Sequence, residues 1–142
     1  MKTLKTIFLM GLTTFGFTLS AQAIDCNTYA SKIVAERPEN SQPLRWAKSI
    51  LYRTYVVSCH LPMDEAAPMT SETIAAASEL YTDISTGYNQ YSTTVHNDLV
   101  RLTKSLRGIE AWLVRSSRTI GGGQASSEAL GEIRNIINQV NQ

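Results

Sequence analysis

The sequence predicts an all-α protein, a small helical bundle of four or five helices. Apolar residues recur at spacings of three and four along most of the chain, which is the period of a helix with one buried face. Capping residues, prolines and glycines separate these periodic segments. Hydrophobic residues make up 43% of the 142 residues, enough for a packed core. A chain of this length is expected to form one domain.

Residues 1–23 are expected to form a cleaved secretory signal peptide rather than part of the fold. They combine lysines near the start, an apolar stretch at 7–19 and a small-residue cleavage site that ends at Ala23. The apolar stretch is shorter than the roughly 20 residues that a membrane-spanning helix needs. We therefore expect residues 24–142 to be a single α-helical domain, periplasmic or secreted after cleavage near Ala23, with no stable membrane insertion.

Two helices are predicted at the start of this domain. Asp25 is suited to cap the first one, which should end before Arg37 and Pro38. Ser41 is suited to cap the second one, with Pro43 in its first turn. The apolar stripe of the first helix comprises Cys26, Ala30, Ile33 and Val34, and the stripe of the second comprises Leu44, Ala47, Leu51, Tyr55 and Ser58.

Cys26 and Cys59 are the only cysteines of the chain. A short connection makes the two helices antiparallel neighbours, which brings the start of the first close to the end of the second, where the cysteines lie. In an oxidising compartment this geometry predicts a structural disulfide that staples an N-terminal helical hairpin. Closing this loop of 33 residues should stabilise the fold by about 3.7 kcal/mol. The spacing does not match the close pairs of redox motifs or the four ligands of zinc sites.

An apolar seam with heptad spacing follows. It comprises Ile74, Ala77, Tyr81, Ile84, Tyr88, Tyr91, Val95, Leu99, Leu102, Leu106, Ile109 and Leu113. The unbroken seam favours one long helix over about 71–119, capped by Thr70 or Ser71. The alternative is a helical hairpin that turns near Gly87, because the segment 82–94 is rich in poor helix formers and Ser92 or Thr93 could cap a new helix.

A last helix is predicted after Gly121, Gly122 and Gly123, which should end the preceding one. Ser126 or Ser127 is suited to cap it. Its apolar side comprises Ala129, Leu130, Ile133, Ile136, Ile137 and Val140.

No residue pattern in the chain indicates catalysis, a metal site or a cofactor. The two histidines, His60 and His96, lack the spacing of metal ligands, and no nucleophile elbow or phosphate-binding loop is present. A base formed by His96 and Asp98 is the one enzymatic alternative. We expect His96 on the surface and His60 near a helix C-terminus, where its charge is favourable.

Charge is divided along the chain, although the net charge is only +1. No lysine or arginine lies between Arg53 and Arg101, whereas residues 101–118 carry a net charge of +4. Trp and Arg dominate interface hot spots, and acidic pairs on a helix face suit a basic partner. The candidate partner-binding residues are Arg107, Trp112, Arg115, Arg118, Glu79 and Asp83.

The sequence therefore predicts a non-enzymatic protein-binding module that acts on another envelope or secreted protein. By analogy of fold, a small helical bundle with a disulfide suits an inhibitor, an immunity protein or a chaperone of the periplasm. The alternative is a structural or assembly component of the envelope or of a secretion apparatus, which pairs with itself as a homo-oligomer through a coiled coil formed by the seam. Nucleic acid is not expected as a partner, given the export signal and the balanced charge.

Overall fold

The computed structural model describes residues 25–61, 63–120 and 124–141, and of these 63–65, 116–120 and 124–126 by their backbone alone. The predicted signal peptide lies outside the described residues. In the described ranges the chain contains helices and no strand, which confirms the predicted all-α class. The five helices are α2 (Cys26–Val34), α3 (Gln42–His60), α4 (Met63–Ser85), α5 (Thr93–Ile120) and α6 (Gln124–Val140).

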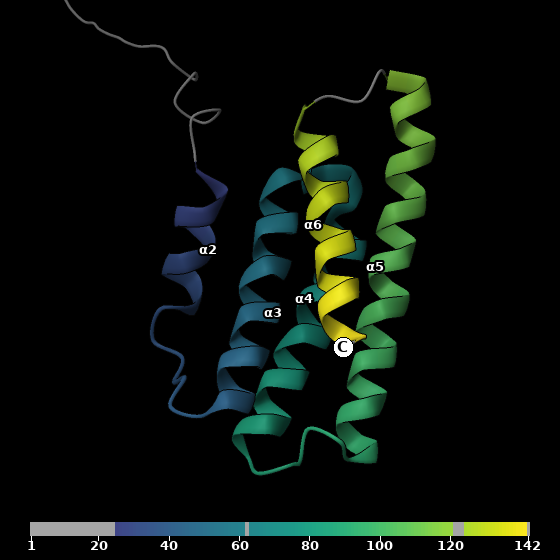
Figure 1. Cartoon of the computed structure of the whole chain (residues 1–142). Coiled ribbons are helices and arrows are strands. Elements are labelled where there is room, and N and C mark those ends of the chain that lie inside the picture. The colour runs from purple at the N-terminus through teal and green to yellow at the C-terminus, as the bar shows by residue number, and fades with distance from the viewer. Residues whose placement is uncertain (1–24, 62, 121–123, 142) are drawn as a thin grey trace, which may run out of the picture.

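Consecutive helices run in opposite directions (Figure 1). Helix α3 packs against α4 and α6, and α5 packs against the same two helices, so these four helices enclose one core. Helix α2 lies outside this arrangement, against α3 (Figure 1). Helix α6 runs along α5 toward the α4–α5 turn and ends short of it, beside the first turns of α5 (Figure 1).

The N-terminal hairpin and its disulfide are confirmed. The Asp25 carboxylate accepts a hydrogen bond from the backbone N–H of Asn27 at 3.0 Å, and the Ser41 hydroxyl accepts one from the N–H of Leu44 at 3.3 Å. Both side chains thus satisfy backbone donors that have no partner inside the helix. Cys26 and Cys59 form a disulfide with their Cα atoms 5.6 Å apart.

The prediction of one long helix over 71–119 is wrong, and the hairpin alternative is what the structure contains. Helix α4 ends at Ser85, and Gly87 continues the chain with φ +110°, a conformation that costs glycine little. The Ser92 hydroxyl accepts the backbone N–H of Val95 and caps α5. The polar segment 82–94 has a weak helix propensity, so the helix breaks there although the apolar spacing continues through it. Two seam residues in the break, Tyr88 and Tyr91, are exposed.

Helix α4 also begins earlier than Thr70 or Ser71, the predicted caps. It starts at Met63 and contains Pro68, which cannot donate a backbone hydrogen bond. The hydroxyl of Thr70 donates to the carbonyl groups of Ala66 and Ala67 instead of capping the helix. The helix therefore begins almost two turns before the predicted caps, with Pro68 inside it.

The core comes mainly from the predicted apolar stripes. Ala77, Tyr81, Ile84, Val95, Leu102, Leu106, Ile109 and Leu113 of the seam are buried, and so are Ala129, Ile133, Ile136 and Ile137 of α6. The two halves of the seam face each other across the hairpin instead of continuing along one axis. Ile33, which was assigned to the stripe of α2, is exposed because α2 has only α3 as a helical neighbour in the described chain.

Candidate functional site

One outward face of α5 is the most distinctive surface of the described chain. Its residues are spaced by three or four positions and therefore lie along one side of the helix. They are His96, Val100, Lys104, Arg107, Ala111 and Arg115, and all six are exposed. We call this set the α5 strip. It borders α6, whose Arg134 reaches across to Glu110 of α5.

The α5 strip is basic, and its acidic neighbour is already paired. Glu110 is hydrogen-bonded by Arg107 at 3.1 Å and by Arg134 at 3.3 Å. Both bonds lower the pKa of Glu110, and the bond from Arg107 has the larger effect. Lys104 and Arg115 make no ion pair within the described residues. Three cations of α5 and one of α6 therefore face solvent together with a single carboxylate.

Two adjoining hollows, which we call the basal hollows, open where the α5 strip meets the end of α6. Their volumes are about 390 and 360 Å³. They share four lining residues, His96, Leu99, Val140 and Asn141. The larger hollow is further lined by Trp46, Gln90, Tyr91 and Gln139, and the smaller by Val100, Thr103 and Lys104. The described lining residues thus combine apolar and aromatic side chains with amides and bases, and none of them is a carboxylate.

Large apolar side chains are exposed around these hollows. Tyr91 is 88% exposed and Val100 is 53% exposed, and Tyr88 in the same α4–α5 turn is 50% exposed. Tyr88 and Tyr91 were expected in the core, as members of the seam. Only the turn between α4 and α5 places them on the surface, so helical spacing could not identify them as site residues.

The predicted partner-binding residues fall on two sides of α5. Arg107 and Arg115 belong to the α5 strip, and the side chain of Arg118 lies outside the described residues. Trp112 packs against the core from another side of the helix. Glu79 and Asp83 lie on α4, so the structure brings neither of them to the α5 strip.

Three carboxyl groups lie close together where α4 meets α5, those of Asp98, Asp83 and Glu79. Asp98 of α5 is only 9% exposed, and its Oδ2 has no hydrogen-bond partner. Burial and the neighbouring carboxyl groups of Asp83 and Glu79 raise the pKa of Asp98 to about 7, and Arg101 partly opposes this effect. Arg101 itself forms an ion pair with Glu72 at 2.6 Å.

The histidines do not assemble a catalytic group with their predicted partners. His96 lines the basal hollows beside α6, whereas Asp98, two residues later, faces Asp83 of α4. His60 is the last residue of α3, as expected, and its Nδ1 lies 3.7 Å from the Sγ of Cys26. A hollow of about 440 Å³ beside it is lined by carboxylates of α6 and by the disulfide.

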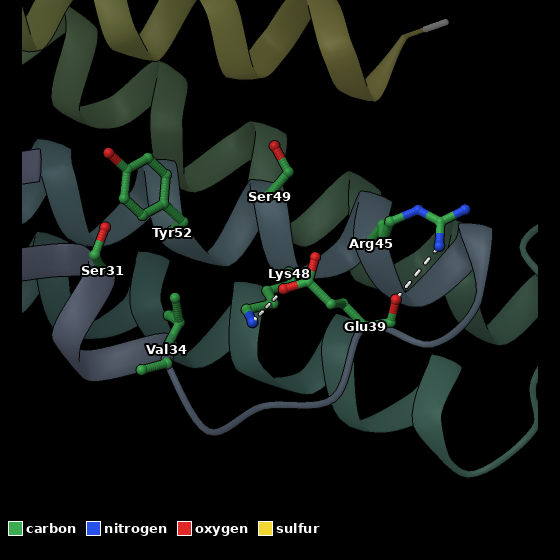
Figure 2. A pocket seen from close by; sticks show the side chains of 8 residues that line it. Ser31, Val34, Glu39, Arg45, Lys48, Ser49 and Tyr52 are labelled. Atoms are coloured by element: carbon green, nitrogen blue, oxygen red, sulfur yellow. Dashed lines mark hydrogen bonds and ion pairs between the residues drawn. The ribbon is translucent and has the colours of Figure 1, made fainter.

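A fourth hollow, of about 320 Å³, lies between α2 and α3 (Figure 2). Glu39 crosses it and accepts a hydrogen bond from Lys48 at 2.7 Å, while its carbonyl group accepts one from Arg45 at 3.4 Å (Figure 2). The bond from Lys48 lowers the pKa of Glu39. Because its charged groups already engage one another, this hollow offers no free charge that would favour a ligand.

The described residues contain no group of three His, Cys, Asp or Glu side chains that could hold a metal ion. Nor does any helix within the described ranges combine the length and apolar character that a bilayer span demands. Comparison with known protein families, curated proteins and solved structures yields no match. The basal hollows and the α5 strip therefore form the candidate site on geometry alone.

Proposed function

We propose that this chain is an exported, non-enzymatic protein-binding module that engages another envelope or secreted protein. The observation that carries the proposal is the gathering of exposed Tyr91 and Val100 around the basal hollows, with Trp46 in their lining. Aromatic side chains next to hollows are typical of interface hot spots, because a partner can fill the hollow and cover the ring. The disulfide agrees with export to an oxidising compartment such as the periplasm.

Self-association into a structural or assembly component of the envelope is the second candidate. One observation favours it, namely that one molecule carries acidic side chains on α4 and bases on the α5 strip. Such separated charges can pair between copies in a head-to-tail contact. Tight packing of the seam inside the bundle argues against the coiled coil between chains that the sequence suggested, because its buried positions are already filled.

Site-specific photocrosslinking in the native envelope tests this proposal. A photoreactive residue at Val100 is expected to crosslink to one foreign protein. The same residue at Tyr29, an exposed position on α2 far from the basal hollows in sequence, serves as the control and should give no such adduct. Adducts between two copies of the chain would favour self-association. Equal labelling from both positions, or none from Val100, would contradict a protein-binding role for the basal hollows.

A further inference from the structure

We propose that the partner engages this site through an acidic amphipathic helix, which lies along the α5 strip with its apolar end in the basal hollows. This inference rests on the proposed function and names the chemistry of its partner. Two independent features of the site carry it, the charge of the strip and the apolar side chains in the lining of the hollows at its base.

The positive charge of the α5 strip favours a partner whose contacting surface is acidic. Lys104, Arg107 and Arg115 follow one another along the exposed side of α5, and Arg134 of α6 adds a fourth base beside them. The chain as a whole is nearly neutral, so this excess of positive charge is local to one face. Acidic side chains facing Lys104 and Arg115 would therefore gain attraction without displacing an ion pair within the described residues.

The geometry determines the shape of the partner. Val100 and Arg115 are 15 residues apart, so the strip is about 22 Å long at 1.5 Å per residue. A helix of about four turns matches this length and presents side chains at the same spacing of three and four. Leu99, Val100 and Val140 offer an apolar anchor at one end, and bases follow along the rest. The complementary segment is therefore apolar at one end and acidic beyond it.

A second copy of the chain meets only half of this requirement. Its acidic residues are most numerous on α4, which carries Glu72, Glu79 and Asp83. The large exposed apolar side chains of the described residues are Tyr29, Ile33, Tyr88, Tyr91 and Val100, none of them on α4. A copy that docked through α4 would leave the basal hollows unfilled. An anionic membrane fits less well, since lipid binding needs large apolar side chains along the whole face, and here they are confined to its base.

The test uses two designed helical peptides of equal length, with leucines in the first turn and, beyond it, either glutamate or lysine at spacings of three and four on an alanine background. Each peptide is fluorescently labelled and titrated against the purified chain with its disulfide intact, and binding is followed by anisotropy. We expect the glutamate peptide to bind at low salt and to be released at high salt, and the lysine peptide not to bind. Lys104→Glu should weaken the binding of the glutamate peptide about tenfold, which corresponds to the loss of about 1.4 kcal/mol.

Lys32→Glu is the matched control, because Lys32 is also an exposed helical lysine without an ion pair in the described chain. It changes the net charge equally and should leave the affinity unchanged. A parallel pair tests the apolar anchor, in which Val100→Ser should weaken binding and Ile33→Ser should not. Circular dichroism confirms that each variant keeps its helices.

Three results would overturn the inference. The first is equal binding of both peptides, and the second is no binding of the glutamate peptide. The third is equal weakening by Lys104→Glu and Lys32→Glu. Binding to phosphatidylglycerol vesicles that is lost in Lys104→Glu, without binding of the glutamate peptide, would assign the face to a membrane instead. A foreign protein crosslinked at Val100 would keep the proposed function intact in each of these cases, and only the acidic helix would be wrong.

Discussion

At the scale of single residues, Asp98 shows how a helix contact can change the chemistry of a side chain. Its position two residues after His96 suggested that Asp98 could pair with that histidine. In the folded hairpin, however, Asp98 faces Asp83 and Glu79 of α4. Burial, a hydrogen bond with Asp83 and the charges of Asp83 and Glu79 all disfavour the ionised form of the Asp98 carboxyl group. Asp98 therefore retains its proton to about pH 7 in the folded chain, compared with 3.8 for an ordinary aspartate.

This raised pKa predicts that the stability of the protein falls as the pH rises. Below pH 3.8 the folded and unfolded chains both hold the proton, so Asp98 costs nothing there. Between that value and about 7 only the folded chain holds it, and the free energy of unfolding decreases until the group ionises in both states. Asp98→Asn, which stays neutral, should therefore raise the free energy of unfolding at pH 8 by about 1–3 kcal/mol. Its effect near pH 4 should be small.

Urea unfolding at both pH values, followed by circular dichroism, measures the difference. Glu72→Gln is the control of opposite sign, since its hydrogen bond with Arg101 lowers the pKa of Glu72. This substitution should slightly destabilise the protein at pH 8 instead of stabilising it. An Asp98→Asn variant that is no more stable at pH 8 than the parent would show that the carboxylate finds a favourable partner in solution.

At the scale of elements, the spacing of the seam predicted which side of α4 and α5 is buried, but not the turn between the two helices. Period and spacing identify the buried side of each helix, and most seam residues from Ala77 to Leu113 are indeed buried. They carry no information about whether the helix continues or folds back, because both arrangements bury the same side. Only the local chemistry of Gly87 and Ser92 decides that, through a left-handed turn and a cap.

Two seam positions test the hairpin directly. Leu106→Ala should lower the free energy of unfolding by about 2–5 kcal/mol, because the side chain is fully buried between the helices. Tyr91→Ala should change it by no more than about 0.5 kcal/mol, because this ring is exposed at the turn. Thermal and urea unfolding of both variants provide the measurement. A comparably large loss for Tyr91→Ala would mean that the ring is buried, as it would be in one continuous helix.

The candidate site was predictable only in part, for a similar reason. The basic run of α5 is visible in the sequence, and Arg107 and Arg115 are exposed on one face of the helix. Trp112 was grouped with them by proximity in sequence, yet it packs against the core from another side. The basal hollows combine residues of α3, the α4–α5 turn, α5 and the end of α6. No local pattern marks a surface assembled from segments so far apart in the chain.

At the scale of the whole molecule, the disulfide joins two unequal parts. Helices α3 to α6 enclose the core, to which Val34 of α2 also contributes, whereas α2 packs against α3 as its one helical neighbour in the described chain. Besides the disulfide, the start of α2 is attached by a hydrogen bond from the Tyr52 hydroxyl to the Asn27 side chain. Its end is held through Pro38, whose carbonyl group accepts a hydrogen bond from Tyr81.

Reduction of the disulfide should therefore release α2 while the other four helices stay folded. A helix of nine residues is marginal on its own in water, so its start should fray once Cys26 is free. The lost loop constraint should lower the free energy of unfolding by about 4 kcal/mol. Hydrogen exchange with and without reductant distinguishes the parts: amides of α2 should exchange faster, while the central turns of α3 and α5 remain protected. Simultaneous loss of protection in all five helices would instead show that α2 and the bundle unfold as one cooperative unit, which would make the staple a condition for the whole fold, the basal hollows included.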